Sequence, residues 1–397
     1  MFLATEFGIY FTNDGGSNWI KLEGGIPTIS FRDIAIQRRE NDLVGASFGR
    51  GFFVLDDYSA LRNLNTADLA NNEALLFDTR KAYWYNQIDD VSSQGANQYV
   101  AENPKYGATF TYFIRDEYKT LEGLRKDTEK ELSKNKQNIP FPGWEALDAE
   151  AVEDGAMLLF TIKDKSGNVV KTLTTKPKKG FNRITWDLST NNKAMVPLEK
   201  PNREFGGTTV LPGTYTVSLA KMQDGNLVEL AGPKSFEVVP LLEPALKGIS
   251  YTERIAFKER YEAFTLRLNK TNLQLDKAQK RLDAMQRAFL LADSQPSNLA
   301  NSLYNLKKEL NDLEIQLNGS KSKDEVGANQ APTPNDARYL GRRALGTTYG
   351  PTGNHSKAID RASKQINTIT PLVNTALAKI PALEKQLTAI GAPPIED

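Results

Sequence analysis

Residues 12–19 read Thr-Asn-Asp-Gly-Gly-Ser-Asn-Trp, a polar stretch that separates two runs of strand-forming residues. We expect Asp14 to accept backbone N–H bonds within its own turn, because a short carboxylate side chain reaches the chain just ahead of it. Gly16 is suited to a positive φ, and the ring of Trp19 can cover the turn. The stretch therefore predicts a β-hairpin turn stabilised by its own polar residues.

Short apolar runs lie on both sides of this turn and recur after it. They occupy 2–5, 8–12, 19–22, 31–36, 43–47 and 52–55. Two sets of short strands within about sixty residues match the size of β-propeller blades. Residues 1–60 are therefore predicted to form terminal propeller blades.

The turn also carries a known pattern. Thr12, Asp14, Gly16 and Trp19 match the Asp-box pattern Ser/Thr-x-Asp-x-Gly-x-x-Trp at every defined position. Together with Gly-Arg-Gly-Phe-Phe-Val-Leu-Asp-Asp at 49–57, the region resembles the last blades of bacterial sortilin-type BNR-repeat proteins. That group is often labelled glycosyl hydrolase, and the resemblance implies an extracellular or periplasmic protein.

Two features qualify this resemblance. Its members often carry a histidine before the Gly-Arg pair, where this chain has Phe48, so any polar role of that histidine is absent. Residues 1–6 lack the basic start of a secretory signal, so we expect the signal on a preceding part of the chain.

Two partial blades cannot bury both faces of their sheets. The remaining blades are therefore expected upstream or from a partner chain.

The middle of the chain, residues 106–243, predicts an Ig-like β-sandwich. Strand-like runs occupy 109–114, 157–163, 169–174, 182–188, 214–220 and 235–239. A charged insert at 116–138 is predicted to be helical and to follow the first strand. Segments 164–173, 180–187 and 212–215 resemble the Ig-like domain of flagellar hook-capping proteins. The polar residues 61–105 are predicted to be a connecting segment.

Residues 244–397 predict helices. Apolar residues recur at alternating spacings of three and four over 257–289, 299–317 and 359–390. This repeat predicts an antiparallel three-helix coiled bundle, which makes the whole chain a multidomain β + α protein. Pro371 and Pro381 fall off the apolar stripe and predict solvent-facing kinks. The Gly-, Pro- and Asn-rich stretch 318–356 is predicted to be a long loop.

Composition excludes several classes of function. The chain has 397 residues and a net charge of +1, which gives no overall electrostatic signal for nucleic acid. No apolar run approaches the roughly 20 residues that span a bilayer. The chain has no cysteine, and its one histidine, His355, lies in the predicted loop, where we expect it to be solvated. We therefore expect neither a metal site nor a cofactor.

The candidate catalytic groups are two adjacent acid pairs, Asp56-Asp57 and Asp89-Asp90. Neighbours on a strand point to opposite faces, so neither pair can flank one glycosidic bond. Solvated strand ends or turns explain both pairs better, and no catalytic residue is assigned.

Two binding candidates remain. Arg50, between two glycines, is the candidate ligand contact at the rim or centre of a propeller, although bonds to neighbouring carbonyls explain it better. The aromatic run Tyr83-Trp84-Tyr85 has the chemistry of a carbohydrate-stacking patch, although a strand core explains such a run better.

Three functional classes stay open. The first is a non-catalytic extracytoplasmic binding protein with an unidentified protein or glycan ligand. The second is a sialidase-like glycoside hydrolase whose catalytic residues lie upstream of this chain. The third is a structural component that oligomerises through its helices. The first is favoured because every strong motif is architectural and none needs a tuned titratable group.

Overall fold

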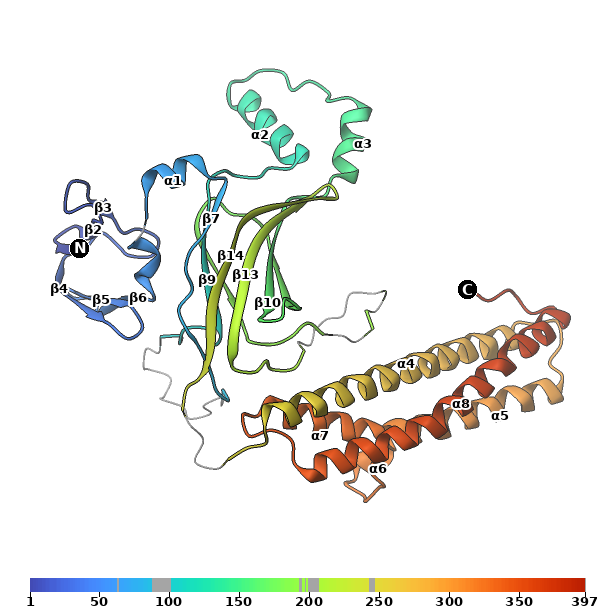
Figure 1. Ribbon diagram of the computed structural model, residues 1–397. Helices are drawn as coiled ribbons and strands as arrows, with labels where there is room; N and C mark the ends of the chain where they lie inside the picture. The colour runs from blue at the N-terminus through green and yellow to red at the C-terminus, as the bar shows by residue number, and fades with distance from the viewer. Residues whose placement is uncertain are drawn as a thin grey trace. The chain divides into compact units, whose positions relative to one another are not determined.

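The computed structural model describes residues 1–62, 64–87, 101–192, 195–196, 198, 207–242 and 247–396. The chain divides into two compact units, one made of Met1–Thr190 and Val210–Leu241 and the other of Asn191–Thr209 and Leu242–Asp397. The first holds mixed β-sheets, and most of the helices lie in the second (Figure 1). The protein is therefore a multidomain β + α protein.

Two three-stranded antiparallel sheets open the first unit. One contains β1 (Phe2–Thr5), β2 (Gly8–Phe11) and β3 (Ile20–Lys21), and the other contains β4 (Phe31–Gln37), β5 (Asp42–Ser47) and β6 (Phe52–Leu55). The sheets share a small core that includes Ile9, Phe31 and Leu43. Gly45 is needed at this interface, since a Cβ there would lie 2.7 Å from the Ile9 side chain. The two sheets thus pack closely against each other.

Eight more strands form two further sheets around one core. They are β7 (Ala74–Leu76), β8 (Ala82–Trp84), β9 (Ala108–Ile114), β10 (Met157–Asp164), β11 (Val169–Thr175), β12 (Gly180–Trp186), β13 (Gly213–Gln223) and β14 (Asn226–Pro240). The sheet orders are β11-β10-β13-β14-β8 and β12-β9-β7. Phe110 of one sheet stacks on Phe160 of the other, with ring centroids 6.4 Å apart. Both side chains are fully buried, so the two sheets are joined by apolar packing.

The range 61–105, which the sequence assigned to a connection, contributes to both of these sheets. β7 pairs with β9, and β8 pairs with β14 as a parallel strand. A 3-10 helix, η1 (Tyr58–Leu61), and helix α1 (Thr66–Asn71) lead into them. The apolar runs of β7 and β8 are only three residues long, which is too short for a periodic signal.

The charged insert folds as two helices. α2 (Leu121–Lys134) lies within the predicted helical range 116–138, and α3 (Trp144–Val152) lies beyond it. Thr120 caps α2 by accepting the Gly123 N–H at 3.1 Å. Neither helix contains a buried residue.

The second unit is built on α4 (Tyr251–Leu290), α5 (Ser297–Asn318) and α8 (Gly353–Ala389). Their apolar stripes meet in one core, as the repeat predicts. Arg260 of α4 lies against Asp360 of α8, and Arg281 lies against Glu384. Residue numbers rise together along both helices, so α4 and α8 are parallel. The short link before α5 reverses the direction of the chain, so α5 runs antiparallel to both α4 and α8.

The prediction of a long loop at 318–356 is wrong. This stretch holds α6 (Lys321–Glu325) and α7 (Pro334–Gly346), and α7 packs on α4 and α8. Its buried face includes Ala337, Gly341 and Ala344, residues too small to give a hydrophobic repeat. Pro371 and Pro381 are exposed, and α8 continues through both.

Candidate binding cleft

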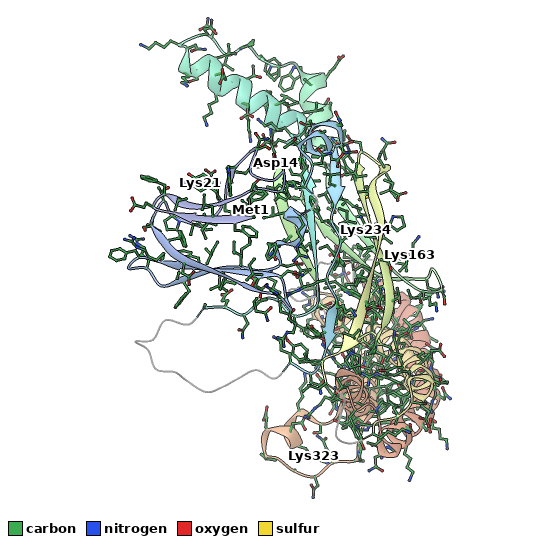
Figure 2. The ribbon with its side chains drawn as sticks, turned by 60° about the vertical axis from the view of Figure 1, so that its left-hand side comes forward. Met1, Asp14, Lys21, Lys163, Lys234 and Lys323 are labelled. Atoms are coloured by element: carbon green, nitrogen blue, oxygen red, sulfur yellow. The ribbon has the colours of Figure 1, made fainter. Side chains whose placement is uncertain are left out.

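The Asp-box stretch forms the loop between β2 and β3, which pair Phe11 with Ile20. Asp14 accepts the Thr12 hydroxyl at 2.7 Å and the Asn18 backbone N–H at 3.1 Å. Figure 2 labels Asp14 and Met1 in this part of the first unit. Asn18 also donates its side-chain amide to the second carboxylate oxygen at 2.8 Å. The hydrogen bonds that the Asp14 carboxylate accepts therefore come from residues of its own loop.

These bonds also affect the protonation of the loop. The Thr12 hydroxyl, and then the two Asn18 donors, hold the pKa of the Asp14 carboxyl well below its ordinary value. Gly16 has a φ of 100° and donates its N–H to the Thr12 hydroxyl at 3.1 Å. The Trp19 indole lies near Gly16, 3.8 Å from where a Cβ would stand. Asp14 is thus a turn-forming carboxylate. It is ionised near neutral pH, and its oxygens accept hydrogen bonds from within the loop.

A cleft of about 640 Å³ lies between the two N-terminal sheets, next to this loop. Its lining residues come from β1, β2, β4 and η1 and from residues adjoining them in the chain. They are Met1, Phe2, Phe11, Thr12, Asn13, Ile34, Ile36, Arg38, Tyr58, Leu61 and Arg62. Aromatic and aliphatic side chains dominate this set, and two guanidinium groups supply its charge. We call it the N-terminal cleft.

The two arginines of the N-terminal cleft are held differently. Arg62 donates to Asn41 Oδ1 at 2.6 Å and to the Tyr58 hydroxyl at 3.0 Å, and its guanidinium lies over the Tyr58 ring. Arg38 is exposed, and its guanidinium has no hydrogen bond or ion pair with any residue that the structure describes. Arg62 is therefore positioned in advance, whereas Arg38 is available to an incoming group.

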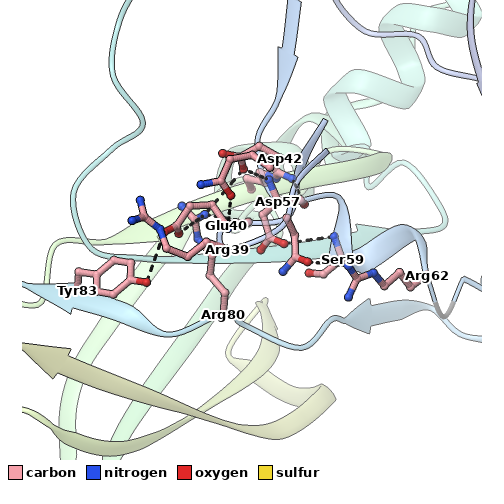
Figure 3. A network of polar contacts seen from close by, with 11 residues as sticks. Arg39, Glu40, Asp42, Asp57, Ser59, Arg62, Arg80 and Tyr83 are labelled. Atoms are coloured by element: carbon pink, nitrogen blue, oxygen red, sulfur yellow. Dashed lines mark hydrogen bonds and ion pairs between the residues drawn. The ribbon is translucent and has the colours of Figure 1, made fainter. Parts of the chain in front are cut away.

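A polar network supports the turn that carries Arg38 (Figure 3). Glu40 accepts from Arg39 at 2.8 Å, from Arg80 at 3.0 Å and from the Tyr83 hydroxyl at 3.3 Å. These bonds tie the β4–β5 turn to the segment that leads into β8. The turn is thus fixed at its base by Glu40, beside the exposed Arg38.

The acid pair at 56–57 is split between two environments. Asp57 has a φ of 43°, accepts the Ser59 N–H at 3.2 Å and caps η1. Its own N–H donates to Asp42 at 2.9 Å. Burial, and then the nearby Asp42 carboxylate, raise the pKa of Asp56. The other pair, Asp89-Asp90, lies outside the described residues.

The remaining candidates are separate from the cleft. Arg50 is exposed in the β5–β6 turn, and its guanidinium has no hydrogen bond or ion pair among the described residues. The expectation that Arg50 bonds to neighbouring carbonyls therefore has no support. Trp84 is buried in the core between the five-stranded sheet and the β12-β9-β7 sheet, while Tyr83 bonds to Glu40 and Tyr85 packs on the Tyr106 ring. The aromatic run is therefore divided among three surroundings and forms no flat stacking surface.

The prediction that His355 lies in a loop is wrong. His355 lies in the first turn of α8, where its Nδ1 accepts the Thr352 N–H at 3.0 Å. Within the described ranges, no three His, Cys, Asp or Glu side chains gather as a metal site does. In the described part of the chain, no helix is both long enough and apolar enough to cross a membrane.

Sequence reasoning did not find the cleft. Tyr58 and Arg62 lie four residues apart across a single helical turn, and this pairing was the only local signal. Arg38 opens the charged stretch Arg38-Arg39-Glu40-Asn41-Asp42, whose composition predicts an ordinary solvated turn. Arg38 lines the cleft only because β1 approaches β4 in the fold. No local pattern in the sequence predicts that approach.

Comparisons with known proteins add little. No family model matches the chain, and no curated protein matches it. Among solved structures, it matches "Crystal structure of dimeric latent PorU from Porphyromonas gingivalis" at 13% sequence identity and a TM-score of 0.21. The match covers 54% of this chain and 13% of that chain. A likeness at this level carries no functional argument.

Proposed function

We propose that this chain is a non-catalytic extracytoplasmic binding protein and that the N-terminal cleft takes its ligand. The observation that supports this most is the lining of the cleft. Among its described lining residues there are two arginines and no carboxylate or histidine. Glycoside hydrolysis needs a positioned carboxylate pair, or a tyrosine nucleophile with an acid/base partner. Tyr58 has no such partner in the lining.

The chemistry of the cleft also defines the class of ligand. Phe2, Phe11 and Tyr58 offer apolar and aromatic surface, while Arg38 and Arg62 offer fixed positive charge. Such a site suits a molecule that combines an apolar group with a carboxylate or another anion. A protein segment or a glycan with acidic groups meets this description.

The proposal includes an architecture. We assign β1–β6 to the terminal blades of an Asp-box propeller, β7–β14 to an Ig-like sandwich and α4, α5 and α8 to a coiled bundle. Phe52 and Val54 on β6 are 76% and 56% exposed, as expected for a sheet face that packs on a further blade. That blade would come from an upstream segment or from a partner chain. The extracytoplasmic location rests on the resemblance of the Asp-box region.

Anilinonaphthalene sulfonate tests the cleft, because it joins aromatic rings to a permanent negative charge. The Arg38→Glu variant should bind this probe about tenfold more weakly or worse, since a hydrogen bond to a charged group contributes about 1.5–3 kcal/mol. Arg361→Glu is the matched control, because Arg361 is also exposed, lies outside the cleft and is no candidate ligand contact. Fluorescence titration of the intact chain measures both affinities.

Equal losses in both variants, or no loss in either, would contradict the assignment of the cleft. A separate assay covers the glycosidase alternative. Intact chain is incubated with methylumbelliferyl sialoside and with neutral methylumbelliferyl glycosides, and we expect no release of fluorophore above the buffer rate. Turnover that depends on protein concentration would overturn the non-catalytic proposal.

A further inference from the structure

Asn41, in the turn between β4 and β5, holds two lining residues of the N-terminal cleft. Its carbonyl oxygen accepts the Tyr58 N–H at 2.8 Å, and its Oδ1 accepts a hydrogen bond from Arg62 Nη2 at 2.6 Å. The Tyr58 hydroxyl accepts a second bond from the same nitrogen at 3.0 Å. Two partners therefore fix the direction of the Arg62 guanidinium, which belongs to the polar network of Figure 3.

The backbone of the turn suits this double role of Asn41. Its φ is 59°, in the left-handed region that asparagine tolerates better than most residues do. The next residue, Asp42, accepts the Asp57 N–H at 2.9 Å, which fixes the start of η1. The preceding residue, Glu40, accepts from Arg80 at 3.0 Å. The turn is thus anchored on both sides of Asn41, so the Asn41 amide is held in place.

A second, smaller pocket lies beside η1 and shares Arg62 with the N-terminal cleft. Its volume is about 360 Å³. Ser59 and Ala60 of η1 line this pocket, whereas Tyr58 and Leu61 line the cleft. Arg62 lines both, so its guanidinium has two surroundings within reach.

The smaller pocket has two carboxylates in its lining, whereas the described lining of the N-terminal cleft has none. Asp78 is paired with Lys234 at 2.8 Å. The Asp68 carboxylate is exposed and makes no hydrogen bond or ion pair within the described ranges. An unrestrained Arg62 would therefore be attracted toward Asp68 and away from the cleft. The bonds to Asn41 and Tyr58 oppose that movement.

We propose that Asn41 is a positioning residue, which keeps the Arg62 charge on the cleft side of η1 and so sets the preference of the cleft for anionic over neutral ligands. This inference rests on the proposed function, in which the cleft takes an apolar ligand with an anionic group. A guanidinium that is already held loses little side-chain entropy when it binds an anion. Asn41 acts through Arg62, since Asn41 itself is not part of the cleft lining.

Two matched probes separate the charge of the cleft from its apolar surface. Anilinonaphthalene sulfonate is anionic, and N-phenyl-1-naphthylamine has the same ring system without the sulfonate. Asn41→Gly keeps the left-handed backbone and the carbonyl that binds Tyr58, but it removes Oδ1. In fluorescence titrations of the intact chain, this variant should bind the sulfonate probe about three- to tenfold more weakly, which is the effect of one long side chain left unordered. Binding of the neutral probe should not change.

A second substitution tests the competing carboxylate. The double variant Asn41→Gly with Asp68→Asn should recover most of the lost sulfonate affinity, because Arg62 then has no free carboxylate to turn toward. This recovery should exceed the effect of Asp68→Asn in the otherwise unchanged chain, as expected for coupled residues. Lys136→Gly is the control, because Lys136 has a φ of 54°, is exposed and lies outside the cleft. It should leave the affinities for both probes unchanged.

Circular dichroism checks that each variant is folded. An equal loss of affinity for both probes in Asn41→Gly would show a general structural role and overturn the proposal. Unchanged sulfonate binding in Asn41→Gly, while Arg38→Glu still weakens it, would overturn this inference and leave the proposed function intact. A double variant that binds no better than Asn41→Gly would also contradict it. Sulfonate binding that does not depend on Arg38 would refute the proposed function, and this inference with it.

Discussion

At the scale of single residues, two hairpins of the first unit use the same side-chain device. Asp14 accepts the backbone N–H of Asn18, and Asp164 accepts that of Asn168, with the asparagine amide bound to the second carboxylate oxygen in both. One hairpin follows β2 and the other follows β10. The spacing of four residues thus identifies the turn in both cases, while Trp19 distinguishes the Asp box.

The Asp14 carboxylate should make the first hairpin sensitive to acid. Because the folded-state pKa of Asp14 lies below its ordinary value of 3.8, the carboxylate stabilises the folded hairpin above that pH. This contribution should fade as the pH falls below 3.8 and through the depressed folded-state pKa. Asp14→Asn should lower the amide-exchange protection of Gly16 and Asn18 several-fold at neutral pH.

Amide exchange followed by NMR measures that protection. Glu23→Gln is the control, because Glu23 is exposed and its carboxylate makes no hydrogen bond or ion pair with the described residues. Wild-type and Asp14→Asn chains should become alike in strongly acidic solution. Protection that stays unchanged in Asp14→Asn at neutral pH would remove the carboxylate from the account of this turn.

At the scale of elements, α7 shows how small residues can hide a helix. A Cβ built on Gly341 would lie 2.5 Å from the Tyr261 ring and 3.2 Å from Ile359. The close approach of α7 to α4 therefore depends on glycine at this position. Long apolar side chains recur along the buried faces of α4, α5 and α8, whereas Leu345 is the one such side chain on the buried face of α7, so no repeat predicts that helix.

Replacement of Gly341 by alanine should destabilise the second unit by about 1–3 kcal/mol through overpacking against Tyr261. Gly346→Ala is the matched control at the end of the same helix, where a new Cβ would meet nothing within 4 Å. That variant should be neutral or slightly stabilising, since alanine favours helix. Thermal unfolding of both variants gives the comparison, and equal effects would contradict the close packing of α7.

At the scale of the whole molecule, the two units have separate cores. Phe160 is fully buried in the first unit, and Phe264 is fully buried in the second. Each unit should therefore unfold as its own cooperative transition. Phe160→Ala and Phe264→Ala should each lower one transition, with a loss of about 3–5 kcal/mol in the unit that carries the change.

Scanning calorimetry of the intact chain resolves those transitions. A single transition that both variants shift equally would show that the units unfold together. Comparison of the two variants makes the test independent of which unit melts first.

The sequence predicts the strands and helices whose apolar residues recur with a regular local spacing. Strands β9–β13, the end of β14 at 235–239 and helices α4, α5 and α8 lie where alternation or a heptad-like repeat predicts them. The cleft could not be foreseen in the same way, because Arg38 and Tyr58 are brought together by the packing of two sheets. The aromatic run at 83–85 indicated strand β8, but its pairing with β14 was hidden, since it joins residues more than a hundred positions apart.

The lack of any buried residue in α2 and α3 has a consequence for engineering. No side chain of α2 or α3 belongs to the core between the β11-β10-β13-β14-β8 and β12-β9-β7 sheets, whereas Tyr118, which precedes α2, packs against that core. A short flexible linker from Thr120 to Met157, which keeps Tyr118, should therefore yield a shortened chain that still folds. The same freedom means that the fold places no demand on Phe141 or Trp144, and both can be exchanged for polar residues to raise solubility.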